Sequence, residues 1–538
     1  LWAHDGQRPG PQLDALTVMA EAGADVSTVG ATAAAEADTE TIRLDNGTVP
    51  VQRLADLEPP LRRSLTSLAS ADGRLKSVDS PWLVGPVSDQ LSSFRSRVAT
   101  ARGHARTGLL ASRIGPALLG NNGPRRYFLA IQTPAELRAT GGIIGNFAEI
   151  TAVGGRLEMT RVGRSDELNF AGRPESRRVE APADFIERYG RFEPERTWQN
   201  VTMSPDFPTV ARVITSLYPQ SGGAPIDGVM SVDPTSLAAL LAVIGPVNVP
   251  GWPEPLTSAN AERVLLHEQY LRIEPRRERA DFLNETAVTI WRRLTSTSLP
   301  GPRALGSALG PSAEGKHLLL WSARPDEQRL FERLGVDGAV PPVVGDFLGV
   351  ITQNAGGNKL DWFLRRSLRY ETELDPGTGE LTANLVVRLE NSAPARNVPP
   401  GLVSREQLAS PQPGENKVIL SVYTPWNLEE ADVDGLPLLV SSEEELGRNV
   451  FSAFLTVPAA GSLEVRVRLS GQMPAEGRYT LSLLHQPTIH PDQVSASLRL
   501  APGWEVDTSS GLRRAESVHA AARFELDRDR TLSAVVAR

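Results

Sequence analysis

The spacing of apolar residues changes twice along this 538-residue chain, and each change restricts the fold of the region concerned. In residues 1–118 apolar side chains recur every three or four positions, as in Leu61, Leu65 and Leu68, which is typical of helices. In residues 119–355 short apolar runs alternate with helical patterns, and after residue 363 apolar residues occupy every second position. We therefore expect a helical stalk or hairpin (1–118), an α/β domain (119–355) and an antiparallel β-sandwich (356–538).

The middle region reads as strands interleaved with helices. Strands are predicted at 125–132, 143–151, 156–162, 226–232 and 245–250, and helices at 206–218, 235–243, 257–273 and 278–295. Gly154 and Gly155 suit a hairpin turn. Asp233 and Pro234 are the residue types that cap and open a helix. This alternation predicts a sheet covered by helices.

The last region predicts a hairpin followed by regularly spaced strands. Residues 367–374 and 381–389 alternate in polarity on either side of the turn 375–377. Further runs of the same kind are separated by Pro and Gly residues, at 418–423, 450–457, 462–469, 479–485 and 494–500. Short strands at such intervals favour an antiparallel sandwich.

Composition excludes several classes of function. The chain has no cysteine, which rules out disulfides, Cys-ligated metal centres and a Cys nucleophile. The formal net charge of −8 argues against nucleic acid as a partner, because nucleic-acid binding needs a basic surface. Only four lysines occur, Lys76, Lys316, Lys359 and Lys417, which makes Schiff-base chemistry improbable. No HExxH, GxGxxG or GxxxxGK[ST] motif is present.

The sequence also suggests a location. No run of 18 or more apolar residues occurs, so no segment of this sequence is expected to span a bilayer. The first residues, Leu1 to His4, do not resemble a natural initiation sequence. We therefore expect that a signal or membrane anchor has been removed. The lack of cysteine suits an extracytoplasmic protein of the cell envelope, or a secreted one, without disulfides.

The densest group of chemically useful residues follows the first predicted strand. Glu136, Arg138, Thr140, Asn146 and Glu149 lie within fourteen residues, together with three glycines. Ligands of α/β sheets bind beyond the carboxyl ends of strands, and glycines let a ligand approach the backbone. The backbone at 140–142 has the composition of an anion-binding nest. The alternative is a tight turn with an ordinary Glu–Arg pair.

Three further groups are candidates. Arg164 and Asp166 follow the third predicted strand, and Asp206 precedes a helix. Residues 272–281 bring several arginines and Asp281 to a helix start. Arginines bind phosphate through two N–H groups. The alternative for Arg164 and Asp166, and for residues 272–281, is a run of charges in contact with solvent. The alternative for Asp206 is helix capping.

Two resemblances follow from these motifs. Residues 136–146, together with Ser204–Pro208, resemble a bacterial family of unknown function, DUF4012. Residues 226–233 and 244–250 are similar to the core of LytR-CpsA-Psr proteins. The second resemblance implies a membrane-anchored, extracytoplasmic enzyme that transfers glycopolymers from polyprenyl-pyrophosphate lipids to peptidoglycan. It also implies phosphate-binding arginines and aspartates on Mg²⁺.

Carried over by position, Arg138, Arg164 and Arg277 or Arg279 would be the phosphate arginines, and Asp166 a Mg²⁺ ligand. The chain departs from the family at two places. Arg138-Ala139-Thr140 lacks the aspartate of the family's first motif, and Pro246 replaces the second glycine of a Gly-Gly-Val turn. A metal site is therefore expected to be weak, because hard cations want several oxygen ligands.

Three hypotheses of function remain. The first is a transferase-like enzyme acting on a lipid-(pyro)phosphate-linked glycopolymer, with a carboxylate that deprotonates the acceptor hydroxyl. The second is a glycoside hydrolase or transglycosylase, for example an endo-arabinanase, that uses a carboxylate pair on a cell-wall polysaccharide. The third is a glycan-binding envelope module without activity. For the enzymes we predict Glu136 as base or nucleophile, Asp166 or Asp206 as the second carboxyl group, and one pocket that joins Glu136, Arg138 and Asp166 to the arginines of 272–279.

Overall fold

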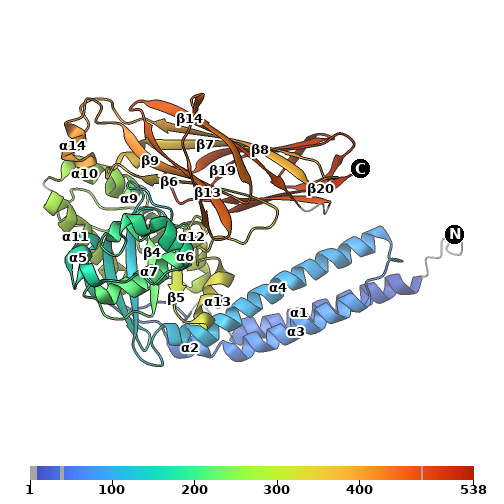
Figure 1. The fold of residues 1–538 in the computed structure, drawn as a ribbon. Helices are drawn as coiled ribbons and strands as arrows, with labels where there is room; N and C mark the ends of the chain where they lie inside the picture. The colour runs from blue at the N-terminus through green and yellow to red at the C-terminus, as the bar shows by residue number, and fades with distance from the viewer. Residues whose placement is uncertain (1–8, 37–40, 275, 474–476) are drawn as a thin grey trace.

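A computed structural model describes residues 9–36, 41–274, 276–473 and 477–538, which form three regions in chain order (Figure 1). Helices at the start form a long bundle that projects from the rest of the molecule. A five-stranded sheet with helices on both faces follows, and two large sheets make up the last part. Among the described residues no helix is both long and apolar enough to cross a membrane.

The first region is a bundle of three long helices, α1 (Pro9–Glu36), α3 (Glu58–Ser77) and α4 (Gly85–Leu118), with the short α2 (Val51–Ala55) at its base. Buried residues repeat every seven positions, as in Leu91, Val98 and Ala105 on α4, so one face of each helix meets its neighbours. Within residues 9–36 and 41–118 the predicted region is therefore mainly helical, except around 42–50 and at the connection 78–84. Segment 42–50 leaves the bundle and contacts the sheet region through a bridge from Thr48 to Arg156.

The central sheet has the strand order β3-β2-β1-β4-β5. Its strands are β1 (Arg125–Thr133), β2 (Ile143–Val153), β3 (Arg156–Arg164), β4 (Gly228–Val232) and β5 (Leu318–Ser322). Only β1 and β4 run parallel, and the other neighbours are antiparallel. Gly154 and Gly155 both have positive φ angles and make the predicted turn between β2 and β3.

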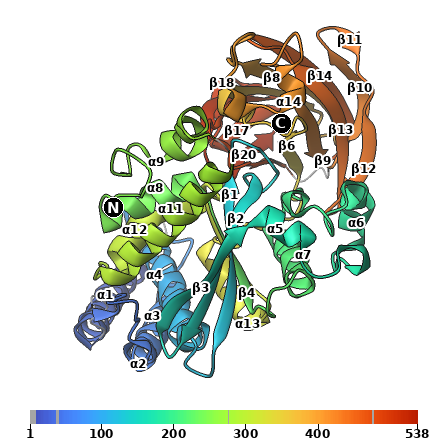
Figure 2. The same ribbon diagram turned by 90° about the vertical axis from the view of Figure 1, so that its left-hand side faces the viewer.

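Helices cover the two faces of this sheet differently (Figure 2). On one face lie α5 (Ser165–Phe170), α6 (Ala183–Tyr189) and α7 (Phe207–Gln220), and on the other α8 (Pro234–Ile244), α11 (Arg276–Ser296) and α12 (Pro302–Glu314). Asp233 caps α8 as predicted, and its carboxylate accepts the backbone N–H groups of Thr235 and Ser236. Three short helices complete the region: α9 (Ala261–Arg263), α10 (Gln269–Arg272) and α13 (Pro325–Leu334).

The last region is a sandwich of one eight-stranded and one seven-stranded sheet, whose inner faces share one large apolar core. The eight-stranded sheet comprises β7 (Leu364–Leu374), β8 (Glu380–Asn391), β10 (Asn427–Val433), β11 (Leu436–Pro437), β14 (Gly461–Gln472), β16 (Asp492–Leu500), β18 (Arg513–Glu516) and β19 (His519–Leu526). The seven-stranded sheet comprises β6 (Asp346–Asn354), β9 (Asn416–Thr424), β12 (Ser441–Glu445), β13 (Arg448–Val457), β15 (Arg478–Leu484), β17 (Glu505–Ser510) and β20 (Arg530–Ala537). The short helix α14 (Arg405–Leu408) precedes β9.

Three predictions about this architecture are wrong in detail. The sandwich is mixed rather than antiparallel, because β16 runs parallel to β7 and β15 runs parallel to β6. Residues 346–354, which the expected boundary at 355 assigns to the α/β domain, form strand β6 inside the sandwich, where every one of them is buried. The strand expected at 245–250 is only a bridge between Val247 and Leu256, since no neighbouring strand is available there.

Candidate functional site

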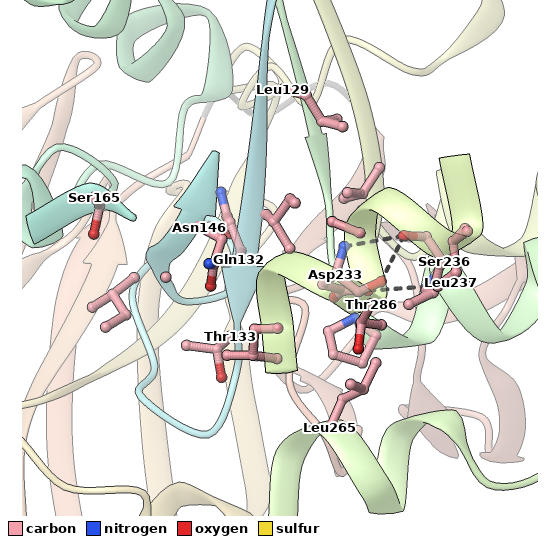
Figure 3. A pocket seen from close by; sticks show the side chains of 18 of the residues that line it. Leu129, Gln132, Thr133, Asn146, Ser165, Asp233, Ser236, Leu237, Leu265 and Thr286 are labelled. Carbon is pink, nitrogen blue, oxygen red and sulfur yellow. Dashed lines mark hydrogen bonds between the residues drawn. The ribbon is translucent and has the colours of Figure 1, made fainter. Parts of the chain in front are cut away.

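A cavity of about 770 Å³ lies between the central sheet and the helices α8, α11 and α12 (Figure 3). Leu129 and Leu237 approach it from the sheet and from α8, and Leu265 and Thr286 approach it from the other helical segments. Most of the lining is aliphatic. Besides these residues it includes Leu44, Val49, Ile131, Ile143, Leu157, Met159, Met230, Val232, Leu240, Leu283, Ile290, Leu294, Leu299, Leu305, Leu309 and Leu318, with Trp291 among them.

The cavity exists because one face of the sheet is not packed. Leu129, Ile131, Met230 and Val232 point to the cavity and are only partly buried, although each lies in a central strand. Their neighbours on the opposite face, such as Phe128, belong to a closely packed core with α7. An apolar face that keeps solvent-accessible area next to a preformed hollow is typical of ligand sites.

Polar side chains gather at one end of the cavity. Cross-strand partners Asn146 and Arg164 occupy the end of the β2–β3 ladder, opposite the Gly154-Gly155 turn. Arg164 donates to the carboxylate of Asp166 through two nitrogens. Its Nε lies 2.9 Å from Asp166 Oδ1, and its Nη2 donates to Asp166 Oδ2. Asn146 donates to Asn284 Oδ1 of α11 over 2.8 Å. We call this region the polar end.

The polar end continues around Tyr270 of α10, just before the arginine-rich segment 272–281. Lys359 Nζ lies 2.7 Å from Glu136 Oε1 and 5.4 Å from the ring centre of Tyr270. Arg279 approaches the same ring at 5.8 Å and pairs with Glu274 at 2.7 Å. Burial raises the pKa of the Tyr270 hydroxyl, so this group stays protonated at neutral pH. Each of the three cations thus has a carboxylate partner.

Five of the candidate residues line one cavity, and Arg138, which we also expected there, does not. Glu136, Asn146, Arg164 and Asp166 line the cavity together with Arg279 of α11. They come from three separate segments of the chain. The backbone of Arg277 also lies in α11, but its side chain lies outside the described residues.

Arg138 does not belong to this cavity, and its predicted role in phosphate binding is wrong. Its guanidinium donates to the carbonyls of Leu137 and Asn354, and to Asn200 Oδ1, over 2.8–3.0 Å. Burial lowers the pKa of Arg138. The side chain therefore fastens the loop after β1 to strand β6 of the sandwich.

The expected anion nest at 140–142 is already filled. Gln132 Oε1 accepts the N–H of Gly142 at 3.1 Å, and Gln132 Nε2 donates to the buried hydroxyl of Thr140 at 3.3 Å. Thr140 is therefore a structural residue and not a ligand of the substrate, because its loop satisfies its own polar groups.

Glu149, Asp206 and Asp281 also lie outside the cavity. Glu149 extends from the packed face of the sheet, where it accepts a hydrogen bond from Tyr218 at 3.1 Å. Asp206 caps α7 and also binds the N–H of Val340, each over 3.0 Å. Asp281 is exposed on α11. The alternation of side chains along a strand explains Glu149, and helix capping explains Asp206.

Sequence reasoning missed two parts of this site. Lys359 comes from the connection between β6 and β7 and pairs with Glu136. The chain has only four lysines, and this rarity was the one signal in the sequence that could have marked Lys359 as a site residue. Asp233 and His317 form a buried pair at the sheet edge, with His317 Nδ1 2.6 Å from Asp233 Oδ2. Burial alone would lower the pKa of His317, but the nearby Asp233 carboxylate outweighs it and raises that pKa.

The polar end does not suit a divalent cation. No group of three or more His, Asp or Glu side chains that could hold a metal ion occurs within the described part of the chain. Asp166, the predicted Mg²⁺ ligand, is engaged with Arg164. A cation there would lack the several oxygen ligands that Mg²⁺ needs, so no step is assigned to a metal.

Comparison with known proteins finds a family match over part of the chain and no activity. No curated protein sequence matches the chain. Among solved structures, yeast LTA4 hydrolase has a TM-score of 0.21 at 8% identity, over 32% of this chain and 29% of that one. An M1 zinc metallopeptidase from Deinococcus radiodurans has a TM-score of 0.18 at 8% identity, over 32% and 42%. Such scores support no inference. Residues 122–270, which run from just before β1 to α10, match the family described as protein of unknown function (DUF4012), as the sequence resemblance predicts.

Proposed function

We propose that this protein binds a lipid whose hydrocarbon chain fills the cavity and whose polar group lies at the polar end. We further propose that it acts there as a transferase on a lipid-(pyro)phosphate-linked glycopolymer of the cell envelope, outside the cytoplasm. The observation that carries the proposal is the large aliphatic cavity that ends in paired charges. The LytR-CpsA-Psr resemblance of residues 226–250 points to the same class of substrate.

The hydrocarbon chain would supply most of the affinity. Each buried methylene contributes roughly 0.8 kcal/mol, so a chain of some ten carbons would outweigh the cost of association. The partly exposed Leu129, Ile131 and Met230 would lose their remaining solvent contact when the chain enters. A sugar polymer would not gain from such walls, because its hydroxyls would lose their partners.

The polar group of the lipid would be held by cations that give up their carboxylate partners within the protein. Arg164, Arg279 and Lys359 each contact a carboxylate, and a phosphate can replace that carboxylate on an arginine with the same two-pronged geometry. The exchange would free Asp166 or Glu136. A freed carboxylate next to the bound phosphate could deprotonate an acceptor hydroxyl, which is the role that we assign to Glu136.

Hydrolysis of a cell-wall polysaccharide remains the alternative, since Glu136 and Asp166 line the same cavity. It predicts release of reducing ends from arabinan or other envelope glycans without any lipid. A glycan-binding module without activity predicts neither release nor transfer. Product analysis with lipid-linked and lipid-free glycans therefore separates the three hypotheses.

Binding is the first test. Geranylgeranyl phosphate should bind the wild-type protein at one site in calorimetry, and Met230→Trp, which fills the cavity, should weaken binding at least tenfold. Leu439→Trp, on a fully exposed loop of the sandwich, is the control and should bind as wild type. If the wild type does not bind, or if Met230→Trp binds equally well, the proposal fails.

A further inference from the structure

Gln269 is a buried polar residue inside an otherwise apolar stretch of the cavity wall. It begins α10, is 0% exposed to solvent and lines the cavity beside Leu265 and Tyr270. A π-helix, Val264–Glu268, leads directly into it. Wide turns of this kind are rare and frequently occur at functional sites.

The orientation of the Gln269 amide follows from its one hydrogen bond. Its side-chain nitrogen donates to the carbonyl oxygen of Leu265. The opposite orientation would place two oxygens against each other, which cannot form a hydrogen bond. The oxygen Oε1 is therefore the atom that remains, and it is buried without a partner among the described residues.

A buried acceptor without a partner is unfavourable, and nearly all such groups in proteins are satisfied. Two glutamine side chains in the described chain have a buried Oε1 of this kind, Gln269 and Gln353. Gln353 lies in β6, away from the cavity, whereas Gln269 lies on its wall. Of these two glutamine oxygens, a ligand in the cavity can therefore meet only that of Gln269.

We infer that Gln269 Oε1 accepts a hydrogen bond from a hydroxyl or amide N–H of the lipid's polar group. This inference rests on the proposed function and specifies the substrate. An oxygen acceptor cannot bind ionised phosphate, whose oxygens are also acceptors. Arg164, Arg279 and Lys359 provide only donors, whereas Gln269 Oε1 is an uncharged acceptor without a partner in the protein. Together they fit a phosphate-linked sugar, which offers oxygens to the former and a hydroxyl to the latter.

The test compares geranylgeranyl phosphate with geranylgeranyl-phosphoryl-glucose in calorimetry. One added hydrogen bond should make the glucose conjugate bind the wild type roughly three- to tenfold more tightly. Gln269→Met removes the acceptor and should abolish this preference. Gln269→Glu keeps an acceptor oxygen and should retain it. Gln353→Met is the matched control and should behave as wild type.

The possible outcomes separate the inference from the proposed function. If neither lipid binds any variant, the proposed function fails. If both lipids bind the wild type equally, then Gln269 holds at most a water molecule and the inference is wrong. The inference is also wrong if Gln269→Met keeps the preference for glucose. Because the first comparison uses only wild-type protein, it decides the matter even if a variant does not fold.

Discussion

The two faces of the central sheet are both apolar, but only one of them is closely packed. On one face Phe128, Phe147 and Leu319 are completely buried against α7 and its neighbours. On the other face Leu129, Ile131 and Met230 border a cavity, because α8, α11 and α12 do not close onto them. Protein interiors are normally packed as densely as organic crystals. A cavity of this size beside a closely packed face of the same sheet therefore indicates a site for a ligand.

Chemical groups are divided between the faces in the same way. The packed face carries Glu149, whose hydrogen bonds to Tyr218 and Thr160 tie it into the fold. The cavity face ends in Arg164, Asp166 and Glu136, whose ion pairs are partly open to solvent. Glu149 therefore stabilises the protein, whereas Asp166 and Glu136 can exchange their partners for a ligand.

The largest expected effect separates these two carboxylates. Glu136→Gln should reduce turnover of a polyprenyl-linked glycan by about a hundredfold or more, as expected for loss of a general base, without changing the unfolding temperature. Glu149→Gln should keep turnover but lower the unfolding temperature, because its hydrogen bonds are buried. Loss of the lipid-linked substrate over time measures turnover. Unchanged turnover in Glu136→Gln would remove Glu136 from the mechanism.

A matched pair of leucine truncations tests the packing difference itself. Leu319→Ala on the packed face should lower the free energy of unfolding by about 2–5 kcal/mol, because it creates a new cavity. Leu129→Ala should cost about 1 kcal/mol, since its side chain already borders an open space. Urea unfolding of both variants gives the two values. Equal losses would mean that the cavity face is packed like the other.

The smallest expected effect is a dependence of the unfolding free energy on pH, because polar contacts contribute to the stability of the cavity face. Asp233 caps α8 and binds His317, whose folded pKa is raised above its ordinary value near 6.5 by Asp233 and, more weakly, by Glu262. Burial opposes the charged form of His317 but is outweighed by these two carboxylates. The pair should stabilise the fold fully below pH 6.5 and lose this contribution as pH rises through the folded pKa.

His317→Gln should remove that pH dependence. Unfolding free energies of the wild type and the variant, measured between pH 5.5 and 9, should differ most at the acidic end and converge as pH rises. A constant difference across this range would show that the pKa of His317 is the same in the folded and unfolded protein, and would contradict this account.

Much of the fold could be predicted because its signals are local. The cap at Asp233, the Gly154-Gly155 turn and the hairpin of β7 and β8 each depend on residues within one short segment. The place of β6 could not be predicted in this way. Its partners β9 and β15 come much later in the chain, and an all-buried strand suits a sheet of either region.

The cavity could not be predicted either. Phe128 to Ile131 reads as one apolar run, which predicts a strand buried on both faces without saying which face is packed. Arg138 shows the same limit. It lies two residues from Glu136, but its direction depends on the carbonyl of Asn354 in another region. The residue types therefore predicted which segments carry the polar end. Which of their side chains lie there depends on tertiary contacts.

The central claim is that a hydrocarbon chain occupies the cavity face of the sheet, and photochemical labelling tests it most directly. A geranylgeranyl phosphate with a diazirine on its chain, irradiated in the bound state, should label residues of β1, β4, α8 and α11 that border the cavity. Excess unlabelled lipid should suppress that labelling. Labelling confined to the outer surface of the sandwich or to the helical bundle, with none on these four elements, would contradict the account.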